Sequence, residues 1–228
     1  EEKVPEKVYT SLEQAFCKAF ALVFEKGTGI IEKSYDRDAL EKDYAVRDFA
    51  VQVKGDRRTL RRFPRENRGA NAKNLLLSTV EGVGLGALGI GLPDIVLFVG
   101  MLLKGIYETA LRYGFPYEDP AEQMWILRMM ETALTKGPLW TEKNQGVDAF
   151  LYQGLMEEPT KEALSQQIQA TAQTFAMDML VLKFIQGLPL VGALGGAANP
   201  VYYRRVLNYV QLKYHKRYLY QKRREMAP

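Results

Sequence analysis

Residues 82–103 constrain the fold more than any other part of the chain. This stretch, GVGLGALGIGLPDIVLFVGMLL, contains a single charged residue, Asp94, which directly follows Pro93. Three structures would account for such a stretch: a dinucleotide-binding glycine loop, a membrane-spanning helix, or two apolar helices folded back on each other. The positions of the glycines, the proline and the aspartate decide between them.

The glycine loop is the weakest of the three explanations. Gly84 to Gly89 match the G-x-G-x-x-G pattern, in which backbone N–H groups at the start of a helix bind a pyrophosphate. That motif needs a strand before it and an uninterrupted helix after it. Here Gly91 and Pro93 follow at once, and no alternating strand pattern surrounds the motif. We therefore expect no dinucleotide, and no other cofactor is indicated.

The membrane-spanning explanation fails at the middle of the stretch. At 1.5 Å per residue the stretch is long enough to cross a hydrocarbon core of about 30 Å. However, Asp94 would lie near the bilayer centre at a cost of about 2.5–3.5 kcal/mol, and Pro93 would break the same turn. We instead predict a helix, a Gly91-Leu92-Pro93-Asp94 turn, and a second helix from Ile95 to about Arg112.

The same pattern occurs a second time near the C-terminus. Gly187-Leu188-Pro189 repeats Gly91-Leu92-Pro93, and Phe184 to Tyr203 contain no charge. Small residues four apart, such as Gly82 and Gly86, allow two helices to approach closely. We predict two apolar hairpins that meet at a tight seam. The seam forms either the buried centre of the domain or an element that dips into one leaflet of a bilayer.

The rest of the chain predicts a single all-α domain over residues 1–228, built around the two hairpins. Apolar residues recur at helical spacing from Leu12 to Val23, and residues 28–55 suit a further, weaker helix. Asp119-Pro120-Ala121-Glu122 is typical of a helix start with a capping box, and Thr160 precedes a long helix. We read the arginine-rich residues 55–71 as a basic surface connection.

Charge and rare residues exclude several kinds of site. The formal net charge is +4, and basic residues gather in residues 57–73 and 204–224, which suits an anionic lipid, nucleic acid or acidic protein partner. Cys17 and His215 are single residues of their types, which excludes an internal disulfide and a cysteine- or histidine-pair metal site. The first residues carry no apolar signal-peptide region, so we expect a cytoplasmic, reducing location.

Two blocks of the sequence resemble the EcsC protein family. They are Gly82 to Asp94 with the following apolar helix and Tyr113-Gly114-Phe115, and KFIQGLPLVGALGGAANPVYYRR near the C-terminus. The resemblance covers about residues 75–120 and 180–220 and implies a mainly helical bacterial domain, cytoplasmic or membrane-associated. The family is named for an association with an ABC-transporter operon, and the resemblance brings no catalytic residue.

The last part of the chain, from Val201 onward, is predicted to form one helix rich in tyrosine and basic residues. Tyr203, Tyr214 and Tyr218 share one face, whereas Arg204 and Lys222 lie on the other. Either the tyrosine face packs on the domain and the charges lie in water, or the tyrosines and cations contact a membrane interface. Nucleic acid is not expected as a partner, because the sequence contains no motif of a known nucleic-acid-binding module.

The preferred function is that of a non-enzymatic protein, peripheral to the membrane, that binds lipid or a membrane-protein partner. The hairpin tips and their flanks supply the candidate contacts with an anionic membrane surface. These are Leu92, Pro93, Leu188, Pro189, Tyr202, Tyr203, Arg204 and Arg205.

The alternative is a hydrolase or transferase that acts on a lipid-like substrate between the hairpins. Carboxylates beside lysines in apolar surroundings can have pKa values shifted toward acid–base catalysis. The polar candidates are Glu81, Asp94, Lys104, Lys183 and Asn199. Ion pairs and helix caps explain the same residues, so none is assigned a catalytic role. A pocket that holds Asp94 and Lys183 together would favour the enzyme.

Overall fold

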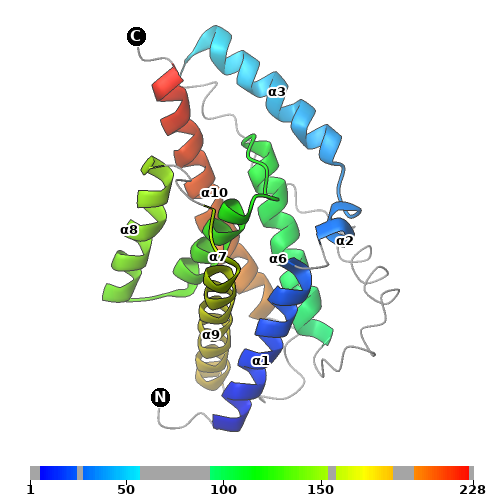
Figure 1. Cartoon of the computed structure of the whole chain (residues 1–228), viewed down its shortest axis with the longest axis vertical. Coiled ribbons are helices and arrows are strands. Elements are labelled where there is room, and N and C mark those ends of the chain that lie inside the picture. The colour runs from blue at the N-terminus through cyan, green and yellow to red at the C-terminus, as the bar shows by residue number, and fades with distance from the viewer. Residues whose placement is uncertain (1–5, 25–27, 57–92, 154–157, 187–197, 226–228) are drawn as a thin grey trace.

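The computed structural model describes residues 6–24, 28–56, 93–153, 158–186 and 198–225, and these residues form helices and short connections without a strand. Figure 1 shows their arrangement as a helical bundle. The helices are α1 (Glu6–Leu22), α2 (Thr28–Glu32), α3 (Arg37–Lys54), α6 (Pro93–Arg112), α7 (Pro120–Leu134), α8 (Pro138–Gln153), α9 (Lys161–Gln186) and α10 (Ala198–Glu225). The predicted all-α class is therefore confirmed.

Helix α7 lies at the centre of the bundle, where it packs against α8, α9 and α10. Trp125, Ile126 and Leu127 are fully buried, as expected for a helix that neighbours cover on nearly every side. Helix α6 packs against α1, α3 and α10. An aromatic cluster of Phe16, Phe20, Phe98 and Phe175 joins α1, α6 and α9, with ring centroids 5.5–6.2 Å apart.

Local capping signals place several helix starts where the sequence predicts them. Helix α6 begins at Pro93, and α7 begins at Pro120 after Asp119, whose side chain accepts a hydrogen bond from the Ala121 amide at 2.9 Å. Thr160 Oγ1 likewise accepts from the Ala163 amide at the start of α9. The predicted capping box is wrong in one part, because the Glu122 carboxylate binds Arg217 and Tyr214 of α10 instead.

The prediction of one helix over residues 28–55 is also wrong. The chain breaks at Ser34–Asp36, where the Asp36 side chain accepts a hydrogen bond from the Ala39 amide and starts α3 as a separate helix. Gly55, with φ of 56°, ends α3 in the left-handed conformation that glycine adopts without strain. Helix α8 begins at Pro138 and has no counterpart among the predicted helices.

The two glycine- and proline-rich segments attach to the same half of the bundle. The start of α6, the end of α9 and the start of α10 all lie in the lower half of Figure 1. Residues 82–92 and 187–197 lie outside the described residues, and with them the predicted hairpins and their seam. No helix within the described ranges combines the length and the apolar character that crossing a bilayer requires.

Helices α6 and α10 approach each other closely at Gly105. A methyl group placed on Gly105 would lie 2.8 Å from both Leu207 Cδ1 and Tyr203 Oη, so a glycine is what permits this spacing. Tyr203 is thus half-buried against α6, and its hydroxyl end lies beside the α6 backbone.

Candidate functional site

The predicted tyrosine face of α10 packs into the bundle. Tyr202, Tyr214 and Tyr218 are buried, and the Tyr202 hydroxyl donates a hydrogen bond to the Asp178 carbonyl oxygen at 2.9 Å. Tyr202 therefore lies in the core and not at the surface where membrane contact would place it. Arg205 pairs with the Asp178 side chain at 3.4 Å, and Arg204 is exposed. Among the four α10 candidates for membrane contact, Arg204 alone is fully at the surface.

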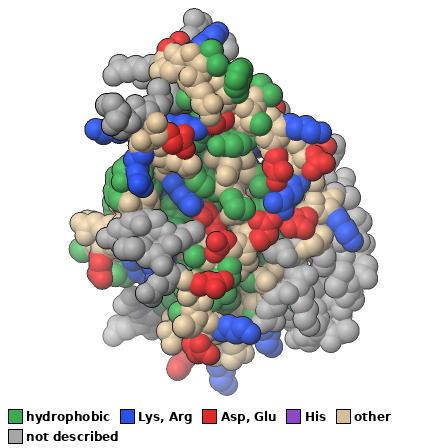
Figure 2. Space-filling model, turned by 45° about the horizontal axis from the view of Figure 1, so that its top comes forward, with side chains coloured by type: hydrophobic (Ala, Val, Ile, Leu, Met, Phe, Trp, Pro, Cys, Tyr) green, Lys and Arg blue, Asp and Glu red, His purple; other side chains and the backbone are tan. Residues whose placement is uncertain are grey.

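Several basic residues of α10 face the protein and not water, which corrects the expectation for this helix. Lys213 pairs with Asp148 at 2.7 Å, Arg217 with Glu122 at 2.7 Å, and Lys222 with Asp48 at 2.7 Å. These pairs connect α10 to α8, α7 and α3 respectively. Figure 2 shows that acidic and basic side chains are also interspersed on one outer face of the molecule.

Burial shifts the pKa values of these paired groups. It raises the pKa of Glu122, although Arg217 and the Tyr214 hydroxyl oppose the rise. It lowers the pKa of Lys213, which the Asp148 hydrogen bond opposes. Burial also acts to raise the pKa of Asp148, but hydrogen bonds from Lys213 and Lys216 hold that pKa below its ordinary value. The pattern is that of charged pairs that hold helices together.

The predicted polar pocket is not tested by the described residues, which include the side chain of Lys104 alone among its five candidates. Lys104 Nζ lies 2.7 Å from Glu108 Oε1 and 2.8 Å from the Ser34 carbonyl oxygen, so it fastens the α2–α3 turn to α6. Glu81, Leu92, Leu188 and Pro189 lie outside the described residues, as do the side chains of Pro93, Asp94, Lys183 and Asn199. The enzymatic alternative therefore stays a prediction.

Three tyrosines near the α2–α3 turn form a cluster that sequence reasoning missed. The Tyr35 hydroxyl donates to the Tyr117 hydroxyl at 2.5 Å, and Tyr117 donates to Glu32 Oε1 at 2.8 Å. The Tyr107 ring stacks on Tyr117 with centroids 4.0 Å apart, and its hydroxyl is buried without a hydrogen-bond partner. Burial raises the pKa of Tyr35 to about 12, so these hydroxyls stay protonated at neutral pH and do not act as bases.

An exposed apolar stripe runs along the outer face of α3. It consists of Val46, Phe49 and Val53, whose relative exposures are 70%, 66% and 65%. We call these three residues the α3 stripe. Their spacing of three and four residues places them on one side of the helix, opposite the inner face that carries the buried residues Asp48 and Val51. Large apolar side chains gathered at one surface indicate an interaction site.

Basic residues accompany the α3 stripe in the structure and in the sequence. Lys42 and Lys54 are exposed on the same helix, together with the acidic residues Asp38, Glu41 and Asp43. Two residues after Gly55 the chain enters residues 57–73, which contain Arg57, Arg58, Arg61, Arg62, Arg65, Arg68 and Lys73 against the single acidic residue Glu66. The sequence contains a signal for this site, because the apolar residues at 46, 49 and 53 recur at three and four residues. The many charged residues in 28–55 made this pattern hard to recognise.

Metal binding has no support in the described part of the chain, where no three His, Cys, Asp or Glu side chains are grouped around a common point. Several described groups with shifted pKa values are instead paired with one another, as are Glu122, Asp148 and Lys213 with α10 or its partners. The α3 stripe is therefore the feature of the described residues that most needs a partner.

Comparison with known proteins agrees with the resemblance found in the sequence. The sequence model of the EcsC protein family matches residues 1–219. Protein EcsC of Bacillus subtilis (strain 168) is 24% identical over 204 residues, which cover 87% of this chain and 73% of that protein. No solved structure matches the chain. Because the family match spans nearly the whole sequence, the chain belongs to the EcsC protein family.

Proposed function

We propose that this protein is a non-enzymatic, peripheral membrane protein that binds an anionic lipid surface through the α3 stripe and the basic residues that follow it. The observation that carries the proposal is the exposure of Val46, Phe49 and Val53 on one side of a helix whose other side is fixed to the bundle. A rigidly held apolar strip with cations beside it suits the boundary between headgroups and acyl chains.

The expected affinity is modest and reversible. Full burial of an aliphatic or aromatic side chain is worth about 1.5–3 kcal/mol, and these three side chains would be covered in part. Each Lys or Arg near an anionic leaflet adds about 1 kcal/mol, so residues such as Lys42, Lys54 and Arg57 supply a further, salt-sensitive share. Binding should therefore depend on both the stripe and the lipid charge, and weaken as salt rises.

The charge of the neighbouring sequence favours a membrane over an uncharged partner. Residues 57–73 carry seven basic residues and one acidic residue, which suits an anionic surface. In this proposal the protein acts at the cytoplasmic face, where a membrane protein such as an ABC transporter is a further possible partner. The glycine-rich segments around Leu92 and Leu188 remain candidates for additional lipid contact.

Liposome flotation tests the proposal. Wild-type protein should float with vesicles that contain phosphatidylserine and stay at the bottom with phosphatidylcholine alone. The variant V46S/F49S/V53S should lose most of its flotation, because it removes the apolar contact from side chains that contribute little to the core. Leu212→Ser is the matched control, since Leu212 is 61% exposed on α10, and it should float like the wild type.

Two results would overturn this function. Protein that stays at the bottom with both vesicle types would exclude direct lipid binding and leave a protein partner. Equal flotation of the triple variant and the wild type would show that α3 is not the attachment surface.

A further inference from the structure

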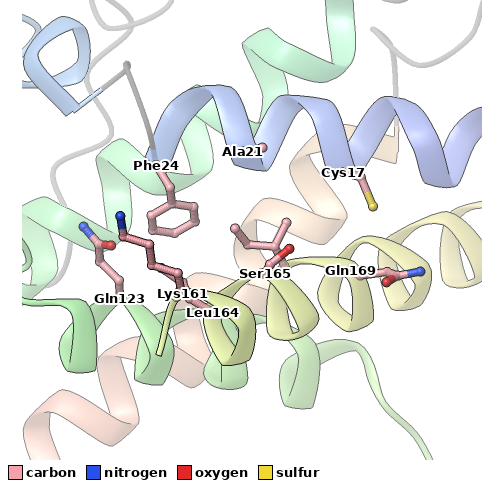
Figure 3. A pocket seen from close by; sticks show the side chains of 9 residues that line it. Cys17, Ala21, Phe24, Gln123, Lys161, Leu164, Ser165 and Gln169 are labelled. Atoms are coloured by element: carbon pink, nitrogen blue, oxygen red, sulfur yellow. The ribbon is translucent and has the colours of Figure 1, made fainter. Parts of the chain in front are cut away.

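A groove of about 520 Å³ lies between α1 and the first turns of α9, with one wall completed by α7. Its volume falls within the range of roughly 300–1,000 Å³ that small-molecule sites occupy. Figure 3 shows Cys17 and Ala21 of α1, with Phe24 just after that helix, along one side and Lys161, Leu164 and Ser165 of α9 along the other. The groove is separate from the α3 stripe, to which it contributes no residue.

The two walls are built by helical spacing. Cys17 and Ala21 of α1 and Phe24 just after it recur at four and three residues, and Leu164 and Ile168 recur at four on α9. At 1.5 Å per residue, the α1 wall from Cys17 to Phe24 is about 10 Å long. The groove is therefore short, with a mostly apolar middle of Ala21, Leu164 and Ile168, and its length suits a medium-length alkyl chain.

One end of the groove is basic, and an acidic residue lies beyond the other end. At one end Lys161, exposed at the N-terminus of α9, lies near Gln123 of α7. Beyond the other end, Glu13 lies one turn before Cys17 on α1, close enough to affect its thiol, and its Oε1 accepts a hydrogen bond from Gln173 Nε2 of α9 at 2.8 Å. An anionic head group would be attracted to Lys161 and to the positive end of the α9 dipole, and repelled from Glu13.

Cys17 belongs to the apolar part of the groove. Burial, and then the nearby Glu13 carboxylate, raise the pKa of its thiol above the ordinary value. The thiol is therefore protonated at neutral pH and acts as a small apolar lining group. Since Cys17 is the single cysteine of the chain, its accessibility reports on the groove without interference from other thiols.

We propose that this groove binds a medium-chain fatty acid, with its carboxylate beside Lys161 and its alkyl chain along Ala21, Phe24, Leu164 and Ile168 toward Cys17. The charge at the two ends fixes the direction of the ligand, and the length of the walls fixes its size. The proposal does not depend on membrane attachment through α3.

The test uses decanoate and the reactivity of Cys17 in the 228-residue chain. Decanoate, kept below its micelle-forming concentration, should slow alkylation of Cys17 by iodoacetamide several-fold at a fixed pH. Decyltrimethylammonium has the same alkyl chain with a cationic head, and it should protect Cys17 far less. Isothermal titration calorimetry on the same samples gives the Kd for decanoate.

Variants locate the site. Lys161→Gln should raise the Kd for decanoate about fivefold, the size expected for one solvent-exposed ion pair. Lys18→Gln, an exposed lysine on α1 that does not line the groove, is the matched control and should leave the Kd unchanged. Ser165→Trp should abolish binding, because an indole at this exposed position would fill the middle of the groove.

The proposal is overturned if decanoate fails to protect Cys17 or if the cationic amphiphile protects it equally. It is also overturned if decanoate binds the Ser165→Trp variant as tightly as the wild type. None of these results bears on flotation of the protein with anionic vesicles, so the groove and the α3 stripe can fail separately.

Discussion

Lys222 of α10 places its Nζ atom 2.7 Å and 2.9 Å from the two carboxylate oxygens of Asp48 on α3. The Tyr218 hydroxyl donates a further hydrogen bond to Asp48 Oδ1 at 2.9 Å. This buried contact sets the rotation of α3 about its own axis, because Asp48 must face α10. The stripe of Val46, Phe49 and Val53 is consequently held on the outer side, where the proposed membrane contact requires it.

Asp48→Asn is expected to destabilise the protein by about 3–5 kcal/mol, because it removes the buried counter-ion of Lys222, which then keeps only the partly exposed Glu225 carboxylate at 2.8 Å. The free energy of unfolding in urea measures the loss. Amide hydrogen exchange should rise most in α3, since that helix loses its connection to α10.

Asp43→Asn on the same helix is the matched control for this change. Asp43 also forms an ion pair, in this case with Arg47. The Asp43 side chain is 67% exposed, whereas that of Asp48 is 12% exposed. An exposed pair four residues apart on a helix is worth about 0.3–0.5 kcal/mol. Similar losses for the two variants would show that the Asp48 contact does not anchor α3.

Glu122→Gln tests the second buried connection of α10. Arg217 Nη1 lies 2.9 Å and 2.7 Å from the two Glu122 oxygens, and its guanidinium group also covers the Phe115 ring, 4.0 Å from the centroid. Removal of the charge should lower the free energy of unfolding by about 3 kcal/mol or more. The same change at the exposed Glu142 of α8 should cost less than about 0.5 kcal/mol, and equal effects would contradict a structural role for the pair.

Local signals made the helix starts predictable from the sequence. Pro93, Pro120 and Thr160 mark starts because a cap or an N-terminal proline acts within one turn of its own position. The partners of Glu122 and Lys222 could not be predicted in this way. Lys222 is 174 residues from Asp48, and helical periodicity says which residues share a face but not which helix covers that face.

The candidate site shows the same limit. The sequence identified the basic residues 57–73, yet the outer face of α3 became visible only when the structure showed its inner face against α6 and α10. Tyr202 was assigned to a membrane interface because tyrosines beside apolar segments suit that environment. Its hydroxyl instead binds the Asp178 carbonyl oxygen of α9, a contact between helices that no local pattern records.

The close approach of α6 and α10 predicts opposite effects of alanine at two helical glycines. Gly146 on α8 has open space around it, so Gly146→Ala should stabilise the protein by about 0.5–1 kcal/mol through helix propensity. At Gly105 the added methyl group would lie 2.8 Å from Leu207 Cδ1, and such overpacking costs about 1–3 kcal/mol. In thermal or urea unfolding, Gly146→Ala should therefore be more stable than the wild type, and Gly105→Ala should be less stable. Stabilisation by both substitutions would mean that the α6–α10 contact is looser than the structure indicates.

His215 should titrate below its ordinary pKa of 6.5, because burial disfavours the imidazolium form. It lies beside Tyr113, the residue that follows α6, with ring centroids 5.8 Å apart. As the single histidine, it gives one set of ring proton signals, so an NMR titration measures its pKa directly. Below pH 6.5 the unfolded chain binds a proton that the folded protein accepts only at lower pH. Stability should consequently fall as the pH drops from about 7.5 through 6.5 toward the pKa of the folded state.

His215→Gln should remove the fall in stability that comes from protonation of His215. It should leave unchanged the loss of stability at lower pH that comes from protonation of the carboxylates. The quantity to compare is the difference in unfolding free energy between wild type and variant at each pH. Burial raises the pKa of Glu122, which changes stability with pH in the opposite direction. This effect is common to both proteins and cancels in the difference. A measured His215 pKa at or above 6.5 would contradict the burial of His215 beside Tyr113. A difference in unfolding free energy that does not change between pH 7.5 and 5.5 would contradict it as well.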